Sequence, residues 1–156
     1  MKNAHWITGS GDSLAYSNMI SQIEEHARDG GKVFVGTDSQ LSNNKCIFVT
    51  AICLHGDGPL KGRYYFTRSK ELFSKNKELR VRITGEVQRS VDMGLTLLEK
   101  FPYADVEIHI DIGSTQRSKT RHLVDLMTSW TKNAGFKCMI KPDAWASASI
   151  ADKHTK

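Results

Sequence analysis

The spacing of apolar positions along the chain predicts four helical segments. In an amphipathic helix apolar residues recur every three or four positions, so that one stripe faces the core. Gly30-Gly31 and Pro102 follow the first two segments and favour a helix stop. Ser114 or Thr115 suits the N-cap of the third. The four segments are residues 13–29, 79–100, about 115–133 and about 143–152.

Five other segments have the pattern of β-strands. Residues 32–38 and 45–54 are apolar on both faces and rich in β-branched residues, which is typical of buried strands. Residues 62–68 are more polar, and residues 106–112 alternate between apolar and polar positions, as in a strand with one buried face. Residues 136–140 complete the set.

The order of these elements predicts an α/β fold. Short links join the first three strands, which favours an antiparallel meander. Helical crossovers lead to the last two strands, so strands one, four and five run parallel in a five-stranded mixed sheet with helices on both faces. At 156 residues the chain suits a single domain, residues 1–156, in which residues 1–31 form an N-terminal helical extension.

Composition narrows the class of protein. The chain is 39% hydrophobic and 25% charged, which excludes a disordered or collagen-like chain. Its 22 Lys and Arg residues exceed its 17 Asp and Glu residues, giving a net charge of +5. A surplus of this size is compatible with a polyanionic partner but does not by itself indicate one.

Cysteine usage and hydropathy predict a cytoplasmic protein with no membrane partner. Cys46, Cys53 and Cys138 are too few and too scattered for a disulfide framework or a zinc site. The longest apolar stretch, residues 46–54, is too short to span a bilayer, and residues 1–12 have no signal-peptide core. The sequence leaves open whether the protein is a monomer or a homodimer.

Acidic residues flank the predicted strands that meet at one edge of the sheet. Asp38 ends the first strand and Asp111 ends the fourth, and ligands bind at the carboxyl ends of parallel strands in α/β sheets. Asp143 follows the fifth strand, and Glu86 lies at the margin of the apolar stripe of the 79–100 helix. Clustered carboxylates repel one another unless cations hold them, and hard oxygen ligands suit Mg²⁺ or Mn²⁺. Taken singly, each Asp could equally be a turn former or a helix cap.

Short motifs around these acids resemble ribonuclease H. The VGTDSQ stretch of residues 35–40 resembles its first active-site strand, GEV at residues 85–87 resembles the region of its second acid, and HIDIG at residues 109–113 that of its third. Together with KPDA at residues 141–144 and ADKHT at residues 151–155, the pattern is similar to the YkuK family of ribonuclease H-like proteins. The resemblance covers residues 32–156.

The resemblance implies a ribonuclease H-like sheet in the strand order 3-2-1-4-5 and a nuclease site held by carboxylates. Asp38, Glu86 and Asp111 would bind Mg²⁺ or Mn²⁺ and catalyse a two-metal hydrolysis of RNA, RNA–DNA hybrid or structured DNA. The fourth acid is Asp143 or Asp152, and we expect Asp143 because the end of the fifth strand fixes its place. His109 or His154 could move protons, although a buried hydrogen-bonded role for His109 and a surface role for His154 are the simpler interpretations.

Two basic segments favour nucleic acid as the partner. Residues 61–82 carry eight basic and two acidic residues, interleaved with aromatics that can stack on bases. A second cluster follows Asp111 at the start of a helix, where phosphate binds well. Lysines that protect an edge strand are the alternative for the first segment. The predicted nucleic-acid-binding residues are Arg117, Lys119, Arg121, Arg63, Arg68 and Lys70.

Two other functions compete with a nuclease. A ribonuclease H-like module could bind nucleic acid without cleaving it. A phosphotransferase is the third possibility, because residues 110–115 and 36–39 superficially resemble the phosphate loops of actin-like sugar kinases, but those enzymes need two such domains.

Overall fold

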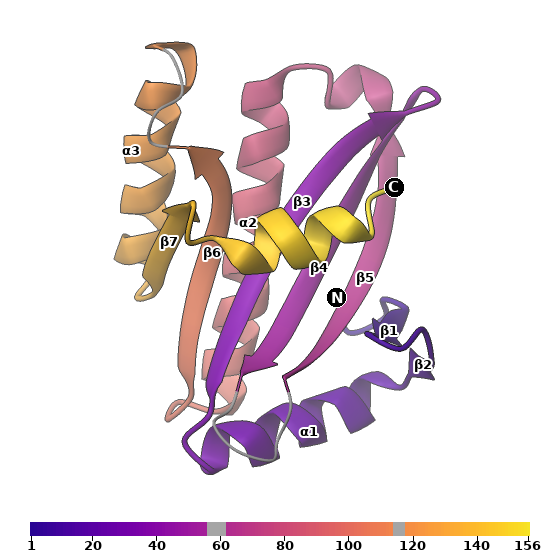
Figure 1. The fold of residues 1–156 in the computed structure, drawn as a ribbon, viewed down its shortest axis with the longest axis vertical. Coiled ribbons are helices and arrows are strands. Elements are labelled where there is room, and N and C mark those ends of the chain that lie inside the picture. The colour runs from indigo at the N-terminus through magenta and orange to yellow at the C-terminus, as the bar shows by residue number, and fades with distance from the viewer. Residues whose placement is uncertain (56–61, 114–117) are drawn as a thin grey trace.

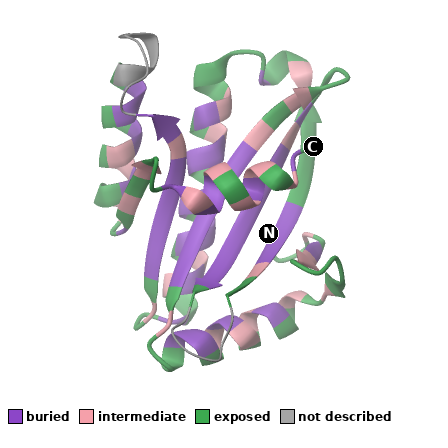
Figure 2. Cartoon of the chain, in the orientation of Figure 1, coloured by how far each residue is buried: buried purple, intermediate pink, exposed green. Residues whose placement is uncertain are grey.

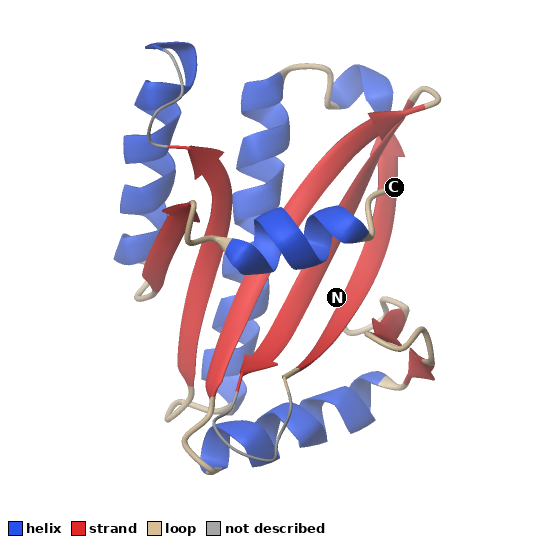
Figure 3. Cartoon of the chain, viewed as in Figure 1, coloured by secondary structure: helices blue, strands red, loops and turns tan. Residues whose placement is uncertain are grey.

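A computed structural model describes residues 1–55, 62–113 and 118–156, with the side chains of residues 118–121 excepted. Seven strands form one mixed sheet in the order β2-β1-β5-β4-β3-β6-β7 (Figure 3). The fold is therefore α/β, as predicted. The strands are β1 (Trp6–Thr8), β2 (Ser13–Leu14), β3 (Lys32–Ser42), β4 (Lys45–His55), β5 (Arg63–Leu72), β6 (Asp105–Gly113) and β7 (Lys137–Lys141).

The predicted count of five strands is wrong. The five predicted strands do lie in the predicted order, as β5-β4-β3-β6-β7, but β1 and β2 extend the sheet beyond β5. These two strands are three and two residues long, too short for an alternating pattern to be visible in the sequence. They form because β2 pairs with β1, and β1 pairs with Tyr65 and Phe66 of β5. Residues 1–31 thus contribute two strands as well as a helix.

Helices cover both faces of the sheet, as predicted (Figure 1). Side chains alternate along β3, so Val33 and Val35 pack in a core with the three α-helices, while Phe34 packs in a second core with Ala146 and Ala151 of η2. We call these two sides of the sheet the α face and the η2 face. The helices are α1 (Tyr16–Arg28), α2 (Leu79–Lys100), α3 (Ser118–Asn133), the 3₁₀ turn η1 (Phe73–Lys75) and the π-helix η2 (Ala146–Ala151).

Helix α2 spans the predicted residues 79–100 because its buried stripe is long and regular. Buried positions such as Ile83, Val87 and Val91 follow one another at helical spacing. Figure 2 shows buried segments, in purple, recurring along α2. No helix in the described parts of the chain is long and apolar enough to cross a membrane.

Strand β3 continues four residues beyond its predicted end at Asp38. It pairs with β4 up to a two-residue hairpin at Asn43 and Asn44, whose φ angles of 46° and 64° are the left-handed values that such a turn requires. Its parallel pairing with β6, in contrast, stops at Thr37 and Ile110. Asp38 therefore lies where β3 and β6 separate rather than at the end of β3.

The π-helix η2 crosses the sheet in direct contact with β3. A Cβ atom on Gly36 would lie 2.5 Å from the backbone nitrogen of Ser147, so only glycine admits the helix at this depth. At the start of η2 the backbone N–H of Ala146 donates to Nδ1 of His109, at 3.1 Å. Since Nδ1 accepts, Nε2 carries the proton and faces Glu107 at 3.2 Å. His109 is thus buried and hydrogen-bonded, and it positions η2.

Candidate functional site

Asp38 and Asp111 meet at the point where β3 and β6 separate. They follow Thr37 and Ile110, the last residues that the two parallel strands pair. Ile110 lies in the core on the α face, so Asp111 projects to the η2 face, as Asp38 does in its own strand. Asp38 is only 7% exposed. The predicted meeting of these two carboxylates at one edge is therefore present in the structure.

Glu86 reaches the same point from the α face. It lies in the buried stripe of α2, is 6% exposed, and accepts a hydrogen bond of 2.6 Å from the hydroxyl of Ser39, the residue after Asp38. One turn further along α2, the hydroxyl of Ser90 lies 2.8 Å from that of Thr37. These two contacts fix α2 against β3, and they hold the carboxylate of Glu86 beside the gap between the strands.

The fourth acid in this cluster is Asp152. Its carboxyl is close enough to that of Asp38 to contribute to the raised pKa of Asp38. Asp152 directly follows η2, and the hydroxyl of Thr155 donates to Gln40 of β3 at 3.1 Å, so the chain on both sides of Asp152 is anchored to the sheet. The four carboxylates come from β3, α2, β6 and the end of η2 (Figure 1). We call Asp38, Glu86, Asp111 and Asp152 the acidic cluster.

Asp143 lies apart from the acidic cluster among the described residues. It is exposed in the turn after β7, where its N–H donates to the carbonyl of Ile140 at 2.9 Å, and its charge acts on His109. The chain must still cross β6 to reach β3, and η2 makes this crossing (Figure 1). The end of η2, not its start, therefore brings a carboxylate to Asp38.

The acidic cluster is electrostatically unfavourable without a cation. Burial, followed by the charges of Glu86 and Asp111, raises the pKa of Asp38 to about 8. Burial also raises the pKa of Glu86 to about 8, and Asp111 adds to the rise while the hydrogen bond from Ser39 opposes it. Groups this costly to charge, gathered in one place, are typical of functional sites.

Two basic side chains share a cavity of about 190 Å³ with three members of the acidic cluster. The ammonium of Lys141 lies 2.8 Å from Oδ1 of Asp111. The ion pair with Asp111 raises the pKa of Lys141, and the charges of Asp38 and Asp152 raise it further. The cavity is lined by Asp38, Ser39, Leu79, Arg82, Ile83, Glu86, Asp111 and Lys141.

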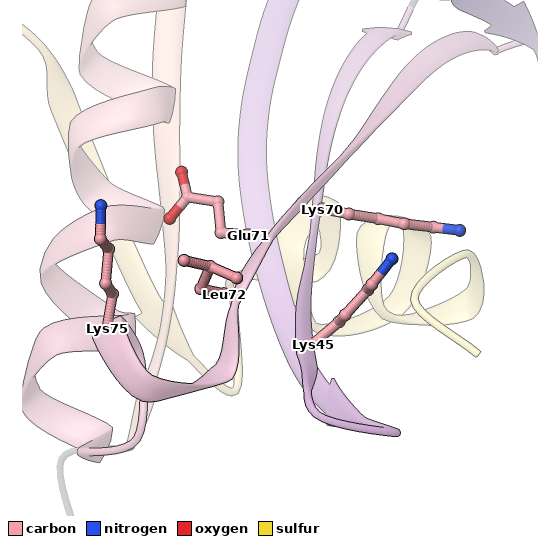
Figure 4. A pocket seen from close by; sticks show the side chains of 5 residues that line it. All are labelled: Lys45, Lys70, Glu71, Leu72 and Lys75. Atoms are coloured by element: carbon pink, nitrogen blue, oxygen red, sulfur yellow. The ribbon is translucent and has the colours of Figure 1, made fainter.

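A basic surface lies beside the acidic cluster on the η2 face. Asp38 pairs with Val49 and Val49 with Arg68, so Arg68 stands two strands, or about 10 Å, from Asp38. Lys45 and Lys70 project to the same side of the sheet (Figure 4). They line a hollow of about 480 Å³ together with Glu71, Leu72 and Lys75. We call Lys45, Arg68 and Lys70 the basic surface.

Arg68 also anchors the C-terminal segment. Its Nε donates to the carbonyl of His154 at 2.7 Å, and the imidazole of His154 stacks on Phe66 with ring centroids 3.8 Å apart. The Tyr64 hydroxyl lies 3.0 Å from Nε2 of the same ring. His154 is therefore half-buried and fastens the end of η2 to β5, rather than being a plain surface residue.

Among the other predicted nucleic-acid-binding residues, the structure describes the side chain of Arg63, which is not part of this surface. Arg63 begins β5, and its charge acts on Tyr65 of the core on the α face. Arg117 lies outside the described residues, and so do the side chains of Lys119 and Arg121. Both of these belong to the first turn of α3, which follows β6 in the chain.

The sequence profile of the ribonuclease H-like family matches residues 15–156. The chain belongs to the ribonuclease H-like family. It is similar to the uncharacterized protein YkuK of Bacillus subtilis (strain 168), with 28% identity over 149 residues that cover 86% of this chain and 84% of the relative. No solved structure matches at a significant level. The predicted resemblance to YkuK proteins is confirmed, and the family points to a function related to nucleic acid.

The acidic cluster offers oxygen ligands that suit a divalent cation, although no cage is preformed among the described residues. Its carboxylate oxygens are the ligands that Mg²⁺ and Mn²⁺ prefer. Oδ1 of Asp111 is buried and accepts no aligned hydrogen bond, even though the Lys141 ammonium is close to it. Among the described residues, no three His, Cys, Asp or Glu side chains are arranged as a ready metal site. A cation would therefore have to draw the carboxylates together.

Sequence reasoning about this ribonuclease H-like site missed Ser39, Lys45 and Lys141. The KPDA stretch that drew attention to Asp143 contains Lys141, and a basic residue at the carboxyl end of a strand was the available signal. For Ser39 the signal was its place next to Asp38. Lys45 follows the Asn43-Asn44 turn, and only the pairing of β4 with β5 shows that it lies near Lys70.

Proposed function

We propose that the protein is a nuclease that depends on Mg²⁺ or Mn²⁺ and hydrolyses phosphodiester bonds of RNA, RNA–DNA hybrid or structured DNA. The observation that carries this proposal is the convergence of Asp38, Glu86, Asp111 and Asp152 at the gap between β3 and β6. Four separate elements bring buried or half-buried carboxylates to one point at a net electrostatic cost, and a ribonuclease H-like fold supplies the context.

The residues of the chain have separate roles in this proposal. The acidic cluster holds the divalent ions, which when bound supply Lewis-acid stabilisation and an activated nucleophile for phosphodiester hydrolysis. Ser39 orients Glu86 through its 2.6 Å hydrogen bond. Lys45 of β4 and Lys70 of β5 contact phosphates of the substrate, so that a backbone laid across the η2 face passes the carboxylates.

A cleavage assay tests the proposal. Wild-type protein is incubated with single-stranded RNA, RNA–DNA hybrid, duplex DNA and branched DNA, with Mn²⁺, with Mg²⁺ or with a chelator. We expect cleavage that requires the metal and falls by about 100-fold or more in Asp38→Asn. Asp105→Asn is the matched control, because Asp105 is exposed at the start of β6. Absence of cleavage of every substrate, with Asp38→Asn indistinguishable from wild type, would contradict the proposal.

A binding module without catalysis is the second candidate. The observation that favours it is the ion pair between Lys141 and Asp111, which neutralises part of the acidic cluster without a metal. This alternative predicts nucleic-acid binding with a steep dependence on salt and no turnover in Mn²⁺ or Mg²⁺. Binding by fluorescence anisotropy, measured alongside the cleavage assay, distinguishes the two functions.

A further inference from the structure

The ion pair between Lys141 and Asp111 is built into the sheet. Lys141 is the last residue of β7 and pairs with Gly113 of β6. Between the pairs His109–Met139 and Gly113–Lys141, β6 advances four residues while β7 advances two. This irregularity sets the end of β7 next to Asp111, and the ammonium of Lys141 meets Oδ1 of Asp111 at 2.8 Å.

This lysine faces more than one member of the acidic cluster. It lines the same cavity as Asp38, Glu86 and Asp111 and also faces Asp152. Its side chain is 44% exposed on a flexible four-carbon stem, whereas that of Asp111 is 17% exposed. The ammonium is therefore placed where a cation is needed and is free to leave towards solvent.

The second cation of the cavity is held in place by its own contacts. Nη1 of Arg82 donates to the carbonyls of Asn76 and Lys77, at 3.4 Å and 3.3 Å. Lys141 is thus the mobile charge of the two. A divalent ion contacts carboxylate oxygens at about 2.0–2.6 Å. It cannot share Oδ1 of Asp111 with an ammonium at 2.8 Å without repulsion between the two cations.

We propose that Lys141 is an internal counter-cation of the acidic cluster, which a divalent ion must displace from Asp111 before it can bind. The inference rests on the proposed function, since it takes the acidic cluster to be the metal site. In the metal-free protein Lys141 offsets the repulsion between the carboxylates. When a divalent ion is present, Lys141 competes with it for Asp111 and so sets the concentration of metal at which the site fills.

Mn²⁺ binding to the full chain tests this inference by isothermal titration calorimetry. Lys141→Met removes the charge and keeps most of the length of the side chain. We expect its Kd for Mn²⁺ to fall by about 2- to 5-fold, as for loss of a partly exposed ion pair. Lys141→Arg keeps the charge and should keep the wild-type Kd. Lys137→Met is the matched control, because Lys137 is exposed at the other end of β7.

Thermal unfolding supplies a second readout that does not involve activity. Without metal, Lys141→Met should unfold at a lower temperature than wild type, because the carboxylates lose their counter-charge. On adding Mn²⁺, the unfolding temperature of Lys141→Met should rise by more than that of wild type. The metal replaces the positive charge that was removed, and it binds more tightly to the variant. If Lys141→Met does not fold, Lys141→Gln gives the same comparison with a polar side chain.

The outcomes separate this inference from the proposed function. A wild-type Kd or weaker Mn²⁺ binding in a folded Lys141→Met variant overturns the inference and leaves the metal site standing. If wild-type protein takes up no Mn²⁺ at all, the proposed function fails and the inference fails with it. Tighter binding in Lys141→Met, together with an unchanged Kd in Lys137→Met, supports both.

Discussion

Burial makes the charge of Asp38 costly, and its neighbours increase the cost. The pKa of Asp38 is raised to about 8 by burial and then by Glu86 and Asp111, whereas the carboxyl of an unfolded chain titrates near pH 4. The folded state therefore binds this proton more tightly than the unfolded state does. Without metal, the contribution of Asp38 to the free energy of unfolding is therefore most favourable below about pH 4 and is lost as the pH rises towards 8.

Asp38→Asn should therefore stabilise the metal-free protein. The gain in the free energy of unfolding should be absent near pH 4 and reach about 1–3 kcal/mol above pH 8, where wild-type Asp38 is charged. Urea denaturation at several pH values in the presence of a chelator measures it. Asp105→Asn should change little at any pH. If Asp38→Asn is less stable than wild type at pH 8.5, the charge of Asp38 does not destabilise the folded protein.

The residues of the site differ in how far the sequence could predict them. Asp38 and Asp111 could be predicted because each follows an apolar strand, and Glu86 because it interrupts the apolar stripe of α2. The choice between Asp143 and Asp152 could not be made from periodicity, because it depends on the path of η2 across the sheet. Gly36 and His109 set that path through contacts with η2, which is distant from both of them in the sequence.

At the scale of elements, η2 is the part that completes the acidic cluster, and it depends on close contact with β3. The backbone of Ser147 lies where a Cβ of residue 36 would be, at 2.5 Å from its nitrogen. π-Helical turns are rare overall, and those that occur are often found at functional sites. Because a π-helix does not follow the period of 3.6 residues of an α-helix, the apolar pattern of the sequence does not describe η2. The same holds for β1 and β2, which exist through pairing rather than through their own pattern.

Gly36→Ala should disturb the acidic cluster without altering any of its members. The added methyl group forces η2 away from β3, and overpacking of this kind costs about 1–3 kcal/mol in the free energy of unfolding. Urea denaturation measures the loss, and Mn²⁺ titration should show weaker binding because Asp152 moves with η2. Gly62→Ala is the control, since its Cβ would meet only the Leu54 carbonyl, at 3.6 Å. Wild-type stability in Gly36→Ala would contradict this account of η2.

At the scale of the whole molecule, a small net charge of +5 conceals a sharp separation of charge. The acidic cluster occupies the gap between β3 and β6, while the basic surface lies on the same face over β4 and β5. The sequence predicted the members of both except Asp152 and Lys45, and it could not predict that they share a face. Their arrangement follows from the register of β3, β4 and β5, in which Asp38, Val49 and Arg68 stand in one row.

Removing charge from the basic surface should weaken nucleic-acid binding through phosphate contacts. For the double variant Lys45→Gln with Lys70→Gln, we expect the slope of log K against log salt to become shallower by about 2, with similar losses for all sequences. Anisotropy titrations between low and moderate salt measure the slope. Lys32→Gln with Lys100→Gln removes the same charge from exposed positions elsewhere and should leave the slope unchanged. Equal slopes in both double variants would exclude the basic surface as the binding site.

In the proposed function, Asp38, Glu86, Asp111 and Asp152 form a metal-dependent nuclease site. The most direct measurement compares cleavage of the substrate panel in Mn²⁺ by wild type, Asp152→Asn and Asp143→Asn. We predict cleavage by wild type only when metal is present, a loss of about 10-fold or more in Asp152→Asn, and nearly wild-type rates in Asp143→Asn. If wild type shows no metal-dependent cleavage, or if only Asp143→Asn loses activity, these four residues do not form the proposed site.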